Sequence, residues 1–174
     1  SGKVMCCSWT NDGQFLALGQ FNGQISVRDK QGNEKLRIVR NSPIWTMKWA
    51  PLRKDNLDVL TVWCWDQTLS FYQLSGQPYG EEKKLDYDPC CLTYYGDAQY
   101  ILMGGSNRGV NMYTRDGVFL KNIVDRDTWV WSLAGRPKNK YVAVGCREGK
   151  LGVYQTVFST VHGLYQDRYA HRDT

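Results

Sequence analysis

Histidine is scarce in this chain, and its two histidines, His162 and His171, both lie near the carboxyl terminus. The six cysteines never form a Cys-x-x-Cys pair, so the ligand spacing of a zinc site is absent. The adjacent pairs Cys6-Cys7 and Cys90-Cys91 place one side chain on each face of an expected strand, which does not suit a disulfide framework. We therefore expect reduced cysteines, no bound metal and a cytosolic compartment.

The sequence also lacks the motifs of common enzyme classes. It has no glycine-rich phosphate loop before a helical pattern, no nucleophile elbow, and no cysteine and histidine close together. Asp86 and Asp88 share one side of an extended segment and could host acid–base chemistry, but solvated loop carboxylates explain them more simply. We expect no catalytic residue and no cofactor.

Long apolar runs are missing too, so we expect no transmembrane segment, and no leader with a cleavage site is visible. With 42% hydrophobic and 13% aromatic content, the 174 residues can still build a sizeable core, which excludes a disordered tail. The net charge of +5 comes from scattered basic residues, as on solvated outer strands. Folding could gather some of them into one patch, but the sequence does not indicate a nucleic-acid or lipid partner.

The sequence does contain one short segment that is repeated four times. If Ile25, Leu69, Val110 and Leu151 are taken as the equivalent position, the separations are 44, 41 and 41 residues. A period of this length, with turn signals between short apolar runs, is typical of the four-stranded blade of a β-propeller.

Each repeat contains four runs that suit successive strands of one sheet. Aromatic residues at equivalent places, Trp9, Trp49 and Tyr94, mark the run expected to be innermost. A nearly unbroken apolar run follows, such as 15–18, which is typical of a strand covered on both faces. The third run alternates apolar and polar residues, and the fourth, at 34–40, is rich in charge, as suits an outer edge.

Glycine marks the expected hairpin between the second and third runs. Gly23 in Asn22-Gly23 tolerates the positive φ of a tight turn, and we expect Gly109 and Gly149 to repeat it, while Asp66-Gln67 lacks it. The second repeat is therefore the least regular. The fourth repeat lacks the next glycine turn, after Tyr154, so we expect its outer strand to come from elsewhere, upstream of Ser1.

These patterns predict an all-β fold: about four consecutive four-stranded antiparallel blades, forming a fragment of a larger β-propeller. The expected divisions are 1–42, 43–86 (an irregular blade), 87–128, 129–158 (the final blade), and 159–174 as a connector toward a second propeller.

Loops that lead into the innermost strands gather at one end of a propeller, where several blades can contact one partner. The candidate protein-binding residues on these loops are Arg40, Asp125, Arg126 and Trp129. Arginine and tryptophan are enriched at interface hot spots, although Trp129 could instead cap the core of a blade. In the connector, Tyr165 and Tyr169 are expected to dock against the next propeller, with a disordered tail as the alternative.

The segment 19–29 is similar to the WD-repeat family, in which a tight turn leads into a strand that ends in Trp-Asp; here Arg28-Asp29 stands at that dipeptide. Tyr72-Gln73, Tyr113-Thr114 and Tyr154-Gln155 occupy the same place in the other repeats. The Gly-His dipeptide of the family is absent, so its buried histidine network cannot form here. The repeats are identified as divergent members of the family, which implies a binding scaffold.

Three longer tracts, 6–14, 70–76 and 158–169, resemble the WD-repeat subunits of intraflagellar transport complex A. The resemblance implies a non-enzymatic scaffold of the cilium or flagellum, including axoneme and basal body, and of the cytoplasm, which supports retrograde transport and ciliary entry of membrane cargo. The implied partners are other propeller-and-helical-repeat subunits of that complex, with a tubby-like adaptor, membrane cargo and the dynein motor reached indirectly. A generic WD-repeat adaptor of another cytosolic complex and a propeller hydrolase are the alternatives.

Overall fold

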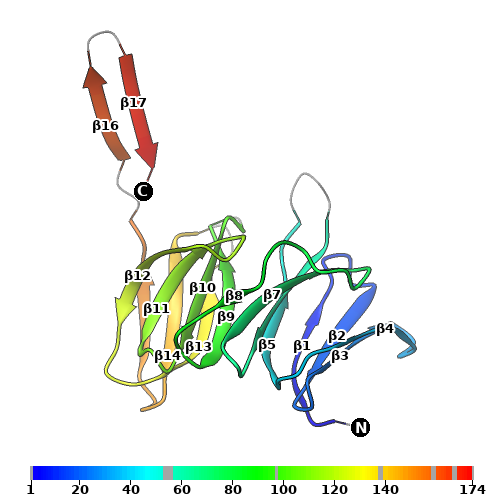
Figure 1. Cartoon of the computed structure of the whole chain (residues 1–174). Helices are drawn as coiled ribbons and strands as arrows, with labels where there is room; N and C mark the ends of the chain where they lie inside the picture. Colours follow the sequence, from blue (N-terminus) through cyan, green and yellow to red (C-terminus); the bar gives the residue numbers. More distant parts are fainter. Residues whose placement is uncertain are drawn as a thin grey trace.

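The structure is a computed structural model that describes residues 2–52, 57–96, 98–136 and 139–157, together with the backbone of 160–165 and 168–173. Every regular element in these residues is a β-strand, and none of them forms a helix that could cross a membrane. Four antiparallel sheets follow one another along the chain, and a separate hairpin extends from the last of them (Figure 1). This arrangement confirms the predicted all-β fold of a β-propeller fragment.

Within each sheet the strands lie side by side in sequence order. The first sheet comprises β1 (Val4–Trp9), β2 (Phe15–Gln20), β3 (Gln24–Asp29) and β4 (Glu34–Val39). The second comprises β5 (Ile44–Trp49), β6 (Val59–Cys64), β7 (Thr68–Gln73) and the short β8 (Lys83–Lys84). The third comprises β9 (Pro89–Tyr95), β10 (Tyr100–Gly105), β11 (Gly109–Thr114) and β12 (Phe119–Asp125). The fourth comprises β13 (Val130–Gly135), β14 (Tyr141–Cys146) and β15 (Leu151–Gln155), and the separate hairpin β16 (Thr160–Tyr165) and β17 (Arg168–Asp173).

The strand registers repeat from sheet to sheet. The second and third strands pair through Gly19 and Ile25 in the first sheet, and through Gly104 and Val110 in the third. Leu69 and Leu151 take the same place in the other two sheets. The four residues chosen from the sequence period are therefore equivalent in the fold.

The hairpin turns correct one detail of the sequence prediction. The residue with positive φ is Gly23 in the first sheet and Gly149 in the fourth, but in the third it is Arg108, with φ of 59°, and not Gly109. Gly109 instead begins β11, where an added Cβ would lie 2.4 Å from the Nδ2 of Asn122. The prediction therefore placed the turn glycine one residue too late. The glycine at position 109 is explained instead by close packing against β12, which leaves no room for a Cβ.

The core lies between neighbouring sheets. Ile25 of the first sheet and Trp49 of the second belong to one buried cluster, and Leu69 of the second and Tyr94 of the third belong to the next. A third cluster joins the third and fourth sheets in the same way. Because burial of one such side chain contributes roughly 1.5–3 kcal/mol, each sheet stabilises the sheets before and after it.

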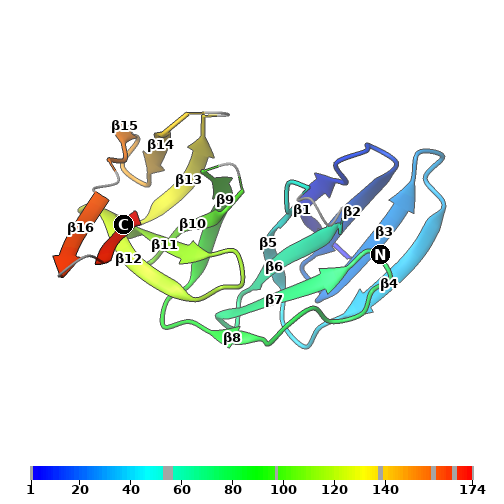
Figure 2. The same cartoon turned by 90° about the horizontal axis from the view of Figure 1, so that it is seen from above.

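The four sheets fan out into an open arc, with β1, β5, β9 and β13 toward its centre (Figure 2). Among the described residues the fourth sheet has three strands, whereas the other sheets have four. Its Leu151 is 72% exposed, although the residues at the same register in the other sheets are fully buried. β15 therefore presents an uncovered edge and an uncovered apolar face.

Candidate protein-binding site

The connections that lead into β5, β9 and β13 lie at the same end of the sheets as the hairpins between each second and third strand; we call this the hairpin end. Backbone hydrogen bonds fix the β12–β13 connection on both sides. The N–H of Arg126 donates to the carbonyl of Arg108 at 2.7 Å, and the N–H of Arg147 donates to the carbonyl of Trp129 at 2.9 Å. The connection is thus held between the hairpin tips of the third and fourth sheets.

Arg126 joins the third sheet to the fourth. Its Nη1 donates to the hydroxyl of Tyr154 on β15 at 2.6 Å, and its Nε lies 3.3 Å from the Sγ of Cys146 on β14. Hydrogen bonds from a charged donor are the stronger ones in proteins. The guanidinium of Arg126 therefore makes its contacts inside the fold, with residues of the fourth sheet.

Arg40 makes the equivalent contact between the first and second sheets. Its Nη1 donates to the hydroxyl of Tyr72 at 3.0 Å and its Nη2 to the Oγ1 of Thr68 at 3.1 Å, and it also forms an ion pair with Glu82. Tyr72 and Tyr154 occupy the same register on β7 and β15. Both arginines selected from the sequence thus bridge neighbouring sheets.

The junction between the second and third sheets uses a different pair. Leu85 stands where the other junctions have arginine, and the hydroxyls of Tyr87 and Tyr113 share a hydrogen bond of 2.9 Å. Burial raises the pKa of Tyr87 well above its usual range, so both phenols stay neutral. A tyrosine on the third strand is therefore common to all three junctions, while its partner varies.

A cleft of about 440 Å³ opens beside the β12–β13 connection, and we call it the hairpin-end cleft. The residues that line it are Arg108, Asp127, Thr128, Trp129, Arg147 and Glu148. The half-buried ring of Trp129 lies 6.1 Å from that of Trp131, and Glu148 pairs with Lys150 at 3.1 Å. The cleft thus offers an indole surface with charges of both signs, which are groups able to contact another protein.

The structure distributes the predicted site residues over several places. Trp129 lines the hairpin-end cleft, and the exposed Asp125 ends β12 next to it. Arg126 lies on the same connection, but its side chain is directed to β14 and β15. Arg40 occupies a different junction, at the first sheet.

The two predicted tyrosines of the connector lie on the separate hairpin. Tyr165 ends β16 opposite Arg168, and Tyr169 lies on β17 opposite Leu164. The docking contact predicted for these tyrosines depends on their side chains, which lie outside the described residues.

Sequence reasoning missed Arg108 and Arg147, which supply the guanidinium groups of the cleft. Apart from the two connector tyrosines, the prediction took its binding residues only from the connections that lead into the innermost strands, whereas Arg108 and Arg147 lie in hairpins between second and third strands. The repeat register could have identified both residues, since each lies in a hairpin turn at the same end of the sheets.

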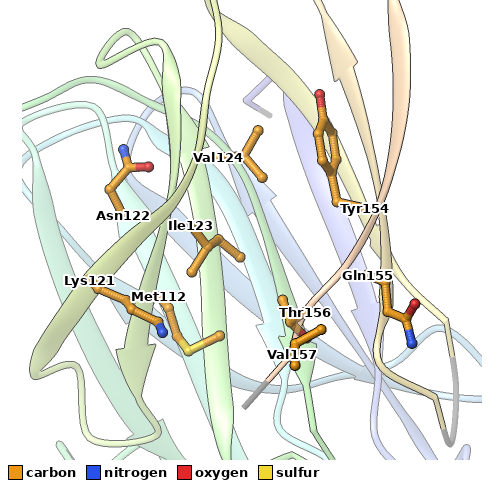
Figure 3. Close-up of a pocket in the computed structure, with 9 residues that line it drawn as sticks. All are labelled: Met112, Lys121, Asn122, Ile123, Val124, Tyr154, Gln155, Thr156 and Val157. Atoms are coloured by element: carbon orange, nitrogen blue, oxygen red, sulfur yellow. The ribbon is translucent and has the colours of Figure 1, made fainter. Parts of the chain in front are cut away.

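A second hollow, the outer groove, lies between β12 and the segment that follows β15, with a volume of about 270 Å³. Met112 and Ile123 form one side of it, and Tyr154 stands on the other (Figure 3). At the first junction the same region is filled, because Leu36 of β4 packs against the turn at Gly76. The groove therefore exists where the fourth sheet has no outer strand among the described residues.

The described residues contain no group of three histidine, cysteine, aspartate or glutamate side chains that could hold a metal ion. All six cysteines lie in the described part of the chain, where each is a free thiol. Burial raises the pKa of Cys6 to about 12, so this thiol is protonated at neutral pH. The prediction that none of them binds metal or forms a disulfide in solution stays a prediction.

Comparison with known proteins identifies the family. A family model described as the IFT122 first beta-propeller matches residues 1–155. Proteins of Mus musculus and Xenopus tropicalis named intraflagellar transport protein 122 homolog are each 51% identical to this chain over 178 residues, and the Homo sapiens protein of that name is 40% identical over 237 residues. All of this chain is covered, but it spans 15% of the mouse and frog proteins and 19% of the human protein. This chain therefore belongs to the family of the first β-propeller of IFT122.

Proposed function

We propose that this chain is part of a non-enzymatic scaffold subunit of intraflagellar transport complex A, which supports retrograde ciliary transport and ciliary entry of membrane cargo. The observation that carries the proposal is 51% identity over the whole chain to proteins named intraflagellar transport protein 122 homolog. A fold of serially packed sheets, whose surface hollows are shaped by loops, suits a role in protein binding.

The proposed partners are other propeller-and-helical-repeat subunits of complex A, with the tubby-like adaptor, membrane cargo and dynein reached through them. The proposed location is the cilium or flagellum, at axoneme and basal body, and the cytoplasm. Within this chain we assign one subunit contact to the hairpin-end cleft, because Trp129 presents a large, half-buried ring in a cleft that two arginines also line. Aromatic residues in partly enclosed sites are frequent hot spots of interfaces.

The test is affinity purification of the tagged full-length protein from ciliated cells, followed by mass spectrometry. We expect complex A subunits to co-purify with the wild type, and at least one of them to be lost with Trp129→Ala. Trp65→Ala is the matched control, since Trp65 is another tryptophan at the hairpin end, 40% exposed, but does not line the cleft. Co-purification of a different cytosolic complex would identify a generic WD-repeat adaptor and contradict the proposal.

A further inference from the structure

A third hollow lies at the end of the sheets away from the hairpin end, and we propose that this opposite-end cleft binds an acidic side chain of a partner protein. Its volume is about 250 Å³. The residues that carry the proposal are Lys48, Thr93, Tyr95, Gly135, Arg136 and Asn139. They come from the second, third and fourth sheets, so the cleft depends on the packing of all three.

The cleft exists because the fourth sheet lacks an aromatic ring. Gly135 occupies the register that holds Trp49 in the second sheet and Tyr94 in the third, where each ring is buried against the preceding sheet. A Cβ at Gly135 would lie 3.0 Å from the carbonyl oxygen of Tyr94, so β13 approaches β9 closely at this point. The space that a ring fills at the other junctions is left open here.

The charges that line the cleft are of one sign. Lys48 takes a register that holds Thr93 and Ala134 in the next two sheets, so a long cation replaces a small side chain. Arg136 directly follows β13, and its N–H is fixed to the carbonyl of Tyr141 at 2.9 Å. Among the described residues that line the cleft there are these two cations and no carboxylate. The hairpin-end cleft, by contrast, carries both signs.

The connections around the cleft carry charges of both signs in the sequence. β5 and β13 end on the side of the arc from which the β16–β17 hairpin extends (Figure 1). The connection after β5 contains Arg53 and Lys54 but also Asp55 and Asp58, and the one after β13 contains Lys138. Asp58 accepts a hydrogen bond from Asn11 at 3.0 Å and does not line the cleft. Arg53, Lys54, Asp55 and Lys138, and Asp97 in the neighbouring connection, lie outside the described residues, so the proposal rests on Lys48 and Arg136.

The size of the cleft indicates what it can hold. At about 250 Å³ the cleft lies near the lower end of the range of ligand pockets, roughly 300–1,000 Å³, which suits one amino-acid side chain. An arginine beside a lysine favours a carboxylate, since guanidinium can bind both oxygens, and Asn139 adds an amide. The ligand is therefore an aspartate or glutamate within an acidic segment.

Fluorescence anisotropy on the purified full-length protein tests the proposal with the labelled peptide Glu-Glu-Asp-Glu-Glu. We expect saturable binding that weakens with added salt, and at least a tenfold higher Kd for Lys48→Glu and for Arg136→Glu. The milder Lys48→Gln serves if a charge reversal disturbs folding, which circular dichroism would show. Lys30→Glu is the matched control: Lys30 is an exposed lysine of the β3–β4 turn outside the cleft, and we expect less than a twofold change.

Several results would overturn the proposal. Equal weakening by Lys30→Glu, or equal binding of the amide peptide Gln-Gln-Asn-Gln-Gln, would show that the cleft does not select the carboxylate. Absence of peptide binding would do the same. If vesicles of phosphatidylserine bind in a Lys48-dependent way and the peptide does not, the cleft belongs to a membrane contact. None of these outcomes depends on which complex contains the protein.

Discussion

Single side chains hold neighbouring sheets together at the junctions, and Arg40 makes three such contacts. It reaches Tyr72, Thr68 and Glu82 across the first junction. Because these bonds link separate sheets, their loss is expected to loosen the junction without changing either sheet internally.

We predict that Arg40→Met lowers the free energy of local opening of the second sheet by about 1.5–3 kcal/mol, the range for hydrogen bonds to a charged group. Hydrogen exchange of the full-length protein, followed by mass spectrometry on peptides covering β6 and β7, measures this change. Arg126→Met is expected to act in the same direction on β14 and β15. Unchanged exchange in both variants would show that the two arginines are not structural, and would return them to the set of binding residues.

Arg108 occupies a backbone position that suits glycine. Its φ of 59° costs a residue with a side chain roughly 1–2 kcal/mol. We therefore predict that Arg108→Gly raises the stability of the β10–β11 hairpin by about 1 kcal/mol, measured by hydrogen exchange, while weakening any partner that uses the hairpin-end cleft. Gly109→Ala is the contrasting variant, because its Cβ would meet Asn122, and it is expected to destabilise the same hairpin.

At the residue scale, sequence reasoning identified equivalent positions but not the direction of side chains. The 44, 41 and 41 spacing was enough to place Ile25 and its counterparts at one register. It could not show that Arg126 turns toward Tyr154, because that contact depends on how two sheets approach each other. Trp129 was correctly placed on a connection at the hairpin end, yet the arginines beside it come from two separate hairpins.

Among the elements, the β3–β4 turn contains a carboxylate that makes it sensitive to acid. Desolvation acts to raise the pKa of Asp29, but hydrogen bonds from Lys35 and Asn33 lower this pKa to about 2. The usual value is about 3.9, so the ionised carboxylate stabilises the turn above about pH 4, and this contribution is lost as the pH falls toward 2.

We predict that Asp29→Asn removes this acid dependence. Pepsin cleavage of full-length protein within residues 24–39 measures it, with the rates of variant and wild type compared at each pH between about 4 and 2. The wild type should resist cleavage better at the upper end of this range, and the advantage should vanish at the lower end. An advantage that does not change with pH would contradict the assignment to Asp29.

The uncovered edge of β15 leads to a prediction about the remainder of the protein. We predict that an outer strand from residues upstream of Ser1 pairs with β15, since each of the other sheets has a fourth strand at this edge. Hydrogen exchange should show protected β15 amides in the full-length protein and faster exchange when the upstream residues are deleted. The amides of β14, which are paired on both sides, serve as the internal control.

Sequence reasoning anticipated most strands but not the hairpin at the end of the chain. The apolar runs of the second strands and the charged run of β4 gave clear strand signals. The segment 159–174 was expected to be a connector toward a second propeller, and no strand was predicted in it; its backbone forms the β16–β17 hairpin, and its role as a connector stays a prediction. The uncovered edge of β15, in contrast, could be anticipated from the missing glycine turn after Tyr154.

For the whole molecule, the sequence period predicted the serial order of the sheets, because similar apolar runs and turn residues recur in each repeat. The hollows between sheets could not be predicted in this way. Each of them arises where one repeat departs from the others, as at Gly135, or where loops of different sheets meet, as at Trp129. The candidate binding sites of this chain therefore lie where one repeat departs from the others or where loops of different sheets meet.

The two outermost sheets have a further consequence for the chain on its own. At one end of the arc Trp9 is 52% exposed, whereas its counterpart Trp49 is 4% exposed because it packs on the preceding sheet. At the other end Leu151 is exposed, because no sheet among the described residues packs on it. The two faces point away from each other in the arc, so a contact between copies through them would be heterologous, head to tail. Whether such a contact closes into a ring or extends into an open filament is set by the rotation from one copy to the next, and therefore by the curvature of the arc itself.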